Sequence, residues 1–107
     1  MKVVFHFDNP EHVHVLIANI KNILKEDDTV EVCVVANSHG VSNFVDDKFG
    51  LTKPIVLDDR VNYYVCNNAM RTRDISEDML ISGVTVVSSG VYKLATLQED
   101  GYHYIKS

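Results

Sequence analysis

The sequence has few cysteines, few basic residues and no long apolar run. Cys33 and Cys66 are the only cysteines among 107 residues, which is too few for a disulfide framework, and the absence of a C-x-x-C pair disfavours a thioredoxin-like redox motif or a zinc knuckle. Ten basic and fifteen acidic residues give a net charge of −5, and the one basic cluster, Arg71 with Arg73, is far smaller than a nucleic-acid footprint. No stretch approaches the roughly 18 apolar residues that cross a bilayer. We therefore expect neither a nucleic-acid nor a membrane partner.

Length and composition indicate one globular domain. The N-terminal residues 1–8 have neither the long apolar core nor the small-residue cleavage site of a signal peptide, so we expect a cytoplasmic protein with reduced thiols. A chain of 107 residues has the size of one domain, and 46% hydrophobic residues are enough to form a core. No repeat, linker or low-complexity tract is visible. We expect a single domain over residues 1–107.

Apolar runs with strand and helix patterns alternate along the chain. Short runs rich in valine and tyrosine predict strands at 2–7, 30–37, 61–65, 83–90 and 102–106. Apolar residues at intervals of three and four predict a helix at 10–25, and shorter helices are predicted at 41–47, after Cys66 and at 91–100. Residues 49–59 read as a loop. Same-direction strands need crossovers, which are right-handed, so this alternation predicts a three-layer α/β/α sandwich with a mostly parallel five-stranded sheet, flavodoxin-like in outline.

Two helix starts carry cap signals. Asn9 is a favoured N-cap residue, and Pro10 at the first helical position loses no hydrogen bond that the helix would have made. Ser76 repeats this pattern and is followed by two acidic residues, which suit the first turn of a helix. Asn9 and Ser76 therefore predict the starts of two helices.

The turns after the strands are the expected place for a site. In an open parallel sheet, ligands bind at the carboxyl ends of the strands. These turns contain the residues Asn37, His39, Cys66, Ser88 and Ser89. Backbone amides in the turns that hold His39 and the two serines suit a small anion, because they lie at predicted helix starts. The strand order is not readable from the sequence, so which turns are neighbours stays open.

Cys66 stands where the third strand becomes a helix, and two interpretations of it stay open. Amide groups at a helix start favour a thiolate, which is the nucleophile of sulfur chemistry. Asn67 and Asn68 add amide donors, and Arg71 lies one turn further on. A strand-terminal cysteine also often only fills space in a core. Cys33, in the middle of a valine-rich strand, is expected to be a packing residue.

The five histidines do not predict a metal site. His12 and His14 lie two residues apart on a helix and point in different directions, so we expect them at the surface. His6 and His39 are the two that can approach a strand-end site as a base or charge partner for Cys66. No Cys/His spacing resembles a zinc site. We expect neither a bound metal nor a cofactor.

The sequence lacks the residues that define other protein classes of this architecture. A flavodoxin needs a phosphate loop after the first strand, where this chain has an acidic, proline-containing turn at 8–11. A response-regulator receiver has an aspartate at the end of the third strand, where Cys66 stands. The cysteine and Arg71 have the spacing of a rhodanese loop, but the glycine expected in such an anion cradle is missing.

The chain resembles the DsrE/DsrF-like family of small sulfur-relay proteins. The resemblance rests on a cysteine that ends the third strand, an apolar strand and turn before the last helix, and the end of that helix. The matching positions are Cys66, Asn68, Met70, residues 83–91, Gln98, Gly101, Tyr102 and Tyr104. Ala69 departs from the pattern because many relatives carry Ser or Thr there, and Ser82 departs because proline is frequent there. The first departure removes a hydroxyl near the thiol.

The resemblance implies a cysteine that carries sulfane sulfur as a persulfide. Our leading hypothesis is a cytoplasmic, sulfurtransferase-like relay protein that uses Cys66, with donor and acceptor proteins as partners. The resemblance also implies a homo-oligomer, commonly a dimer, trimer or hexamer. The alternative is a homo-oligomeric module of the same fold that binds a small ligand or a partner without turnover. In the leading hypothesis Asn67 and Asn68 stabilise the thiolate, and Arg71 or His39 supplies positive charge.

Overall fold

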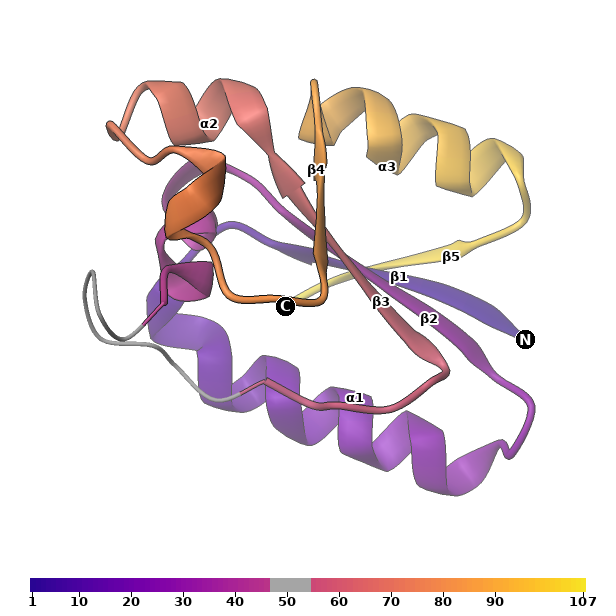
Figure 1. Ribbon diagram of the computed structural model, residues 1–107. Helices are drawn as coiled ribbons and strands as arrows, with labels where there is room; N and C mark the ends of the chain where they lie inside the picture. The colour runs from indigo at the N-terminus through magenta and orange to yellow at the C-terminus, as the bar shows by residue number, and fades with distance from the viewer. Residues whose placement is uncertain (47–54) are drawn as a thin grey trace.

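The protein forms one five-stranded sheet in which all strands are parallel. The computed structural model describes residues 1–46 and 55–107. Its strands are β1 (Lys2–Phe7), β2 (Glu31–Ala36), β3 (Val61–Cys66), β4 (Val84–Val87) and β5 (His103–Lys106). The order across the sheet is β4-β3-β2-β1-β5. The five strands predicted from the sequence are all present, and the sheet places the N-terminal and C-terminal strands side by side (Figure 1).

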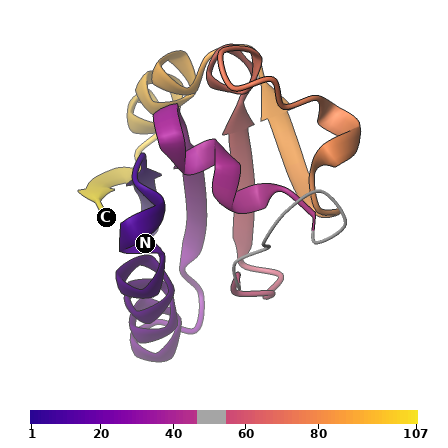
Figure 2. The same ribbon diagram turned by 90° about the vertical axis from the view of Figure 1, so that its left-hand side faces the viewer.

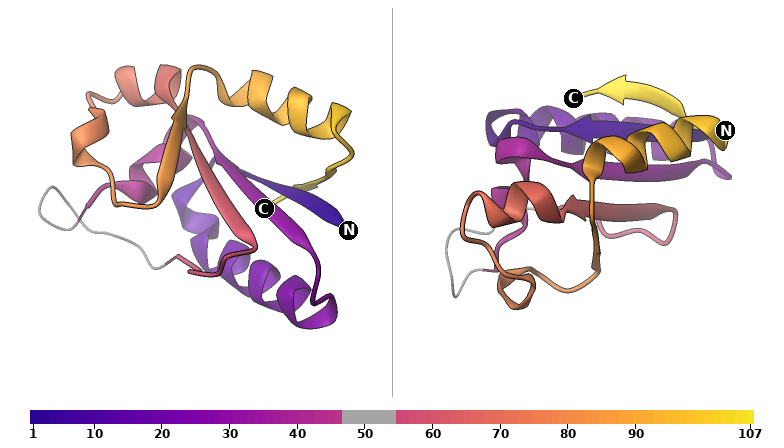
Figure 3. Two further views of the ribbon diagram at one scale, coloured as in Figure 1. Left: turned by 45° about the vertical axis from the view of Figure 1, so that its right-hand side comes forward. Right: turned by 90° about the horizontal axis from the view of Figure 1, so that it is seen from above.

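Helices cover both faces of the sheet, as the alternation predicted. The helical segments are η1 (Pro10–His12), α1 (Val13–Glu26), η2 (Ser38–Phe44), α2 (Asn67–Arg71), η4 (Glu77–Met79) and α3 (Gly90–Glu99). Figure 1 and the left view of Figure 3 show α1 below the sheet and α3 above it. The result is the three-layer α/β/α arrangement. Among the described residues no helix is long and apolar enough to span a bilayer.

The larger core lies between the sheet and α1. Alternate side chains of β1, such as Phe5 and Phe7, point to this face and are buried together with Leu16 and Ile20 of α1. This follows from strand geometry, because every second side chain faces the same side. Each such side chain contributes about 1.5–3 kcal/mol when it is fully buried. The core therefore holds α1 firmly against β1 and β2.

The opposite face has a smaller core under α3. Val4 of β1 and Cys33 and Val35 of β2 pack against Leu94 and Leu97 of α3. Tyr64 and Tyr102 flank this cluster and are only partly buried. Strand residues on this face nearer to β4, such as Thr85, are exposed. A single helix thus covers only the middle of the face.

The segment after β1 shows why the first helix begins where it does. The side chain of Asn9 accepts a hydrogen bond from the backbone N–H of Glu11 at 3.0 Å, and Pro10 opens the helical segment. This confirms the predicted cap. The first turn, η1, is a 3-10 turn rather than part of an α-helix running from residue 10, and α1 follows it and ends at Glu26.

The segment after β2 differs from the prediction of a helix at 41–47. Residues 38–44 form the 3-10 helix η2, and Val45 already pairs with Leu80 in an isolated bridge. A Cβ on Gly40 would stand only 2.4 Å from the carbonyl oxygen of Phe7. The close approach of η2 to the end of β1 therefore requires glycine at this position.

Three strands are shorter than predicted, and the loop at 49–59 is only partly described. β2 covers Glu31–Ala36 instead of 30–37, β4 covers Val84–Val87 instead of 83–90, and β5 covers His103–Lys106 instead of 102–106. The fourth strand ends early because Ser89 leaves the sheet to cap α3. Residues 55–58 belong to no helix or strand, as predicted, whereas 47–54 lie outside the described residues.

Candidate functional site

Cys66 is the last residue of β3 and directly precedes α2. Its neighbour in the sheet is Val87, the last residue of β4. Figures 1 and 2 show that α2 and α3 lie side by side at the edge of the sheet where β3 ends. Only 6% of Cys66 is exposed. The thiol therefore lies at the predicted edge, with limited access from solvent.

Three chain segments meet at Cys66. A Cβ on Gly90 would stand 3.0 Å from the Cβ of Asn37 and 3.1 Å from the Cβ of Cys66. Gly90 is the first residue of α3, and the Ser89 hydroxyl caps this helix by accepting a hydrogen bond from the Tyr92 N–H at 3.2 Å. The absence of a side chain at Gly90 lets the start of α3 lie directly on the ends of β2 and β3. Cys66 consequently contacts the first residue of α3 as well as preceding α2.

A row of hydrogen bonds runs from Asn37 toward the edge of the sheet. The ring nitrogen Nε2 of His6 lies 2.8 Å from Asn37 Oδ1, and the hydroxyl of Tyr104 lies 2.6 Å from Nδ1 of the same ring. Because an amide oxygen only accepts, Nε2–H donates to Asn37, and Nδ1 accepts the Tyr104 hydroxyl proton. Asn37, His6 and Tyr104 come from three adjacent strands or strand ends. They form a continuous polar row that starts beside Cys66.

The residues after Cys66 differ in burial and in hydrogen-bond partners. Asn67 opens α2 and is partly buried, while Asn68 is exposed. The guanidinium of Arg71 donates to the side-chain oxygen of Asn68. Arg71 thus has a partner on its own helix, and the structure records no ion pair between Arg71 and another group of the described chain. The guanidinium of Arg71, predicted to supply positive charge for the thiol, is thus hydrogen-bonded to Asn68.

His39 lines a surface pocket that Cys66 does not line. It lines a surface pocket beside the η1 turn together with Asp8, Asn9, Pro10, Glu11, Ser38 and Ser42. Ser38 adopts a left-handed backbone conformation with φ of 51° there. Of the two serines predicted for the site, Ser88 is exposed and the Ser89 hydroxyl is used in the cap. The structure places His6 rather than His39 in the polar row that leads to Cys66.

Two of the three residues in this row, Asn37 and His6, could be placed near this edge from the sequence. The position of Asn37 at the end of β2 placed it at the correct edge, and His6 was one of two candidate histidines. The contribution of Tyr104 was missed because it depends on β5 lying next to β1. Gly90 was also missed, because its role depends on the path of α3 over two strand ends.

Cys33 is a packing residue, as predicted. It is 2% exposed and lies in the small core under α3. Burial raises the pKa of its thiol above the ordinary value of 9.0, although the neighbouring Tyr102 hydroxyl and the Lys93 ammonium favour its thiolate. The ammonium of Lys93 lies 4.3 Å from the centre of the Tyr64 ring, over this cluster. Cys33 is therefore a poor nucleophile in the folded protein.

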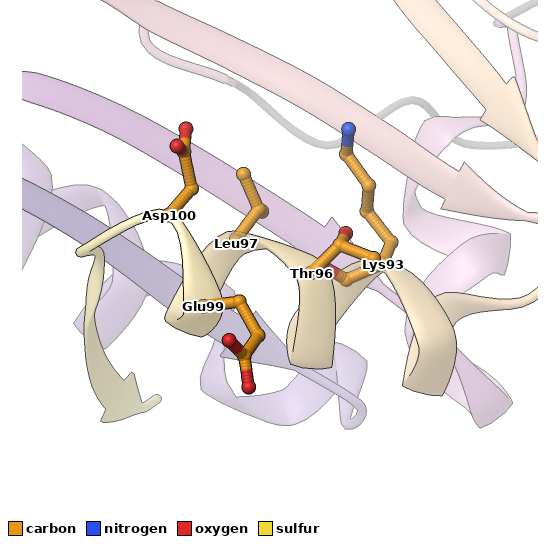
Figure 4. A pocket seen from close by; sticks show the side chains of 5 residues that line it. All are labelled: Lys93, Thr96, Leu97, Glu99 and Asp100. Atoms are coloured by element: carbon orange, nitrogen blue, oxygen red, sulfur yellow. The ribbon is translucent and has the colours of Figure 1, made fainter.

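A further pocket lies along the second half of α3, away from its start at Gly90. It is lined by Lys93, Thr96, Leu97, Glu99 and Asp100. Figure 4 shows Lys93 and Asp100 pointing to one side of the helix and Glu99 to the other. Its side chains are of mixed charge, and neither Cys66 nor Asn37 lines it.

The described residues contain no group of three or more histidine, cysteine, aspartate or glutamate side chains that could hold a metal ion. His12 and His14 are exposed. The Nδ1 atom of His12 lies 3.2 Å from the carbonyl oxygen of Ser107, and His14 lies on the outer side of α1. The described histidines thus take structural or surface positions.

Comparison with known proteins identifies relatives of the same fold. The model of the DsrE/DsrF-like family matches residues 1–107. A protein of unknown function, MTH1491 from Methanobacterium thermoautotrophicum, is 30% identical over 99% of this chain and 98% of its own, with a TM-score of 0.82. The ychN protein of E. coli superposes over 100% of this chain and 99% of its own with a TM-score of 0.78 at 15% identity, which shows a shared fold. No curated protein matches the sequence. A five-stranded parallel sheet whose third strand ends in Cys66, together with the family match along its whole length, shows that the chain belongs to the DsrE/DsrF-like family.

Proposed function

We propose that the protein is a sulfur-relay protein that carries sulfane sulfur as a persulfide on Cys66. One observation carries this proposal: the thiol stands at the carboxyl edge of the sheet, where α2 begins after it and α3 begins against it. Backbone amides and the dipole at a helix start favour an anion, and both the thiolate and the persulfide are anions. Membership of the DsrE/DsrF-like family supports the same chemistry.

The relay consists of two displacements without net oxidation. The Cys66 thiolate attacks the outer sulfur of a persulfide on a donor protein, a new S–S bond forms, and the donor sulfur leaves with the electron pair as a thiolate. A thiolate on the acceptor then attacks the outer sulfur on Cys66, and the Cys66 thiolate is released. Each step breaks one S–S bond and forms another, and it proceeds by attack of a thiolate as in disulfide exchange.

The burial of Cys66 restricts which partners can react. Because 6% of the residue is exposed, the donor and the acceptor must present their sulfur on a protruding side chain or a mobile segment. Val91 and Tyr92, at the start of α3, are 68% and 71% exposed. Aromatic residues such as Tyr92 are enriched at protein interfaces. We place the docking of partner proteins and of further copies of this chain near the start of α3, in a cytoplasmic setting that keeps the thiol reduced.

Mass spectrometry of the purified protein after incubation with a low-molecular-weight persulfide donor tests the proposal. The expected product carries one additional sulfur atom on Cys66, and dithiothreitol removes it. Cys66→Ser is expected to abolish loading, whereas Cys33→Ser, at the buried packing residue, leaves it intact. Loading confined to Cys33, or equal loading of the Cys66→Ser variant, would contradict the proposal.

The alternative is a partner-binding homo-oligomeric module without turnover. The specific observation in its favour is the burial of Cys66, which is 6% exposed and joins a cluster of buried residues that includes Ala69 and Met70. In that case Cys66 fills space against the start of α3 and carries no sulfur. The two functions differ in the alkylation rate of the native protein: an iodoacetamide rate at neutral pH below that of free cysteine favours the module.

A further inference from the structure

We propose that Asn37 is the side chain that stabilises the anionic sulfur on Cys66, and that His6 and Tyr104 are positioning residues that orient it. The inference rests on the proposed function and adds three residues to its site. The reacting group is the sulfur anion, either the thiolate or the persulfide. The chemistry required is a fixed N–H donor beside it, because hydrogen bonds to a charged group are stronger than those to a neutral one.

Asn37 stands next to Cys66 in the sheet. The pairing of β2 with β3 ends at Ala36 and Val65, so the next residue on each strand is Asn37 and Cys66. Both Cβ atoms lie within 3.0–3.1 Å of the same point above Gly90. The two side chains therefore leave the sheet on the same face, under the start of α3.

The amide of Asn37 has a defined orientation. Its oxygen accepts from His6 on β1, and β2 lies between β1 and β3 in the sheet. Because the oxygen faces β1, the nitrogen of the planar amide is turned away from β1. An asparagine without such an anchor could rotate its amide by half a turn and present oxygen, which would repel an anion.

The amide nitrogen is available for a ligand. Within the described ranges 1–46 and 55–107, the structure records no hydrogen-bond partner for Asn37 Nδ2, whereas its backbone N–H and C=O are bonded to Phe7 and Gly40. Tyr104 donates to His6, and His6 donates to Asn37. The row therefore ends at the two N–H groups of Asn37 Nδ2. The thiol on the neighbouring strand end belongs to Cys66, whose Cβ lies against the same glycine as the Cβ of Asn37.

The charged and titratable groups around the row come from several elements. His6 stands beside the ion pair between Asp8 and Lys106, whose charged atoms are 2.7 Å apart. Lys93 of α3 lies over Tyr64, and Arg71 of α2 is bound to Asn68. Asn37, which lies beside Cys66, is uncharged. Replacing it by a carboxylate therefore places a negative charge beside both the thiol and the His6 ring.

The test measures the rate of iodoacetamide alkylation of Cys66 against pH in a Cys33→Ser background. Asn37→Asp keeps the shape, removes the donor and adds a negative charge, so we expect alkylation at neutral pH to slow about fivefold and the midpoint of the curve to move to higher pH. Asn9→Asp is the matched control. It adds the same charge on the same edge and keeps the cap to Glu11, and we expect less than about a twofold change.

A second pair of variants tests the orientation. His6→Leu removes the donor to Asn37 Oδ1, and we expect alkylation to slow about threefold because the amide is free to turn. His6→Gln retains an N–H donor and is expected to restore most of the rate. This pair also decides the matter if circular dichroism shows that Asn37→Asp does not fold.

The outcomes separate this inference from the proposed function. Alkylation curves of Asn37→Asp and His6→Leu that superpose on the parent curve overturn the inference, even if the parent protein accepts sulfur. If His6→Gln behaves as His6→Leu does, the positioning role of His6 is overturned. If the variants shift the curves as expected and the parent accepts no sulfur from the persulfide donor, the relay proposal fails and the role of Asn37 stands.

Discussion

Gly90 and Cys66 are in direct contact: a Cβ on Gly90 would stand 3.1 Å from the Cβ of Cys66. Both Cβ positions are fixed by their backbones, so no side-chain rotation relieves the contact. We expect Gly90→Ala to push the start of α3 away from β3 and to lower the free energy of unfolding by about 1–2 kcal/mol. Chemical denaturation measures this effect.

Gly83→Ala is the matched control for Gly90→Ala. Gly83 has a φ of 89°, and a Cβ there would meet no atom within 4 Å, so this variant costs stability through backbone strain alone. We expect the alkylation rate of Cys66 to change in Gly90→Ala and to stay at the parent value in Gly83→Ala. Equal rates in both variants would show that Gly90 does not control access to the thiol.

The two thiols are expected to react at very different rates. Cys33 is 2% exposed, and burial raises the pKa of its thiol. We expect iodoacetamide at neutral pH to modify Cys66 at least about tenfold faster than Cys33, because the thiolate is the reactive form. Peptide mapping after timed quenching measures both rates. Modification of Cys33 at a comparable rate in the native protein would contradict the packing role assigned to it.

Tyr63 links β3 to the segment that precedes it. Its hydroxyl donates to the carbonyl oxygen of Val56 at 2.7 Å and accepts from the Val56 N–H at 3.1 Å. We expect Tyr63→Phe to lower the free energy of unfolding by about 1–3 kcal/mol, because it leaves these backbone groups without their partner. Tyr92→Phe, at a 71% exposed position, is the control and is expected to leave stability unchanged.

Tyr63 also gives the protein an alkaline limit. Burial raises its pKa from 10.0 to about 12, so the unfolded chain loses this proton at lower pH than the folded protein does. The contribution of Tyr63 to stability is therefore complete below pH 10 and is lost as the pH rises from about 10 to 12. Denaturation curves over this range should converge for the parent and Tyr63→Phe. A constant difference between them would refute the assignment.

The acid limit depends on aspartates that are paired in the fold. A hydrogen bond from Lys106 lowers the pKa of Asp8, and one from Arg60 lowers the pKa of Asp58, both below the ordinary value of 3.8. Their contribution to stability is complete above that value and is lost as the pH falls through the lower values of the folded state. We expect the denaturant concentration at the midpoint of unfolding to decrease when the pH is lowered below about 4. Asp58→Asn is expected to make this decrease smaller. If the midpoint of Asp58→Asn depends on pH in the same way as the midpoint of the parent protein, Asp58 does not have this role.

The order of residues in each strand was sufficient to predict the edge on which the site lies. Because side chains alternate and parallel strands end at one edge, the positions of Cys66 and Asn37 at strand ends placed them there before their distance was known. The cap at Asn9 was predictable for the same reason, since it depends on the residues that follow it directly. The helix after β2 was predicted at 41–47 but is a 3-10 helix that begins at Ser38, and the approach of Gly40 to the carbonyl of Phe7 is a contact outside its local sequence.

The sequence alone determined the α/β/α class, the five strands and the place of Cys66 at the end of the third strand, because these follow from local hydrophobic periodicity and turn residues. Only the tertiary structure decided that the order is β4-β3-β2-β1-β5. That order brings Tyr104 to His6 across 98 positions of sequence and sets Gly90 on Cys66 and Asn37. The reason is physical: strand order depends on which apolar faces bury each other, and no local pattern records the partner of a strand.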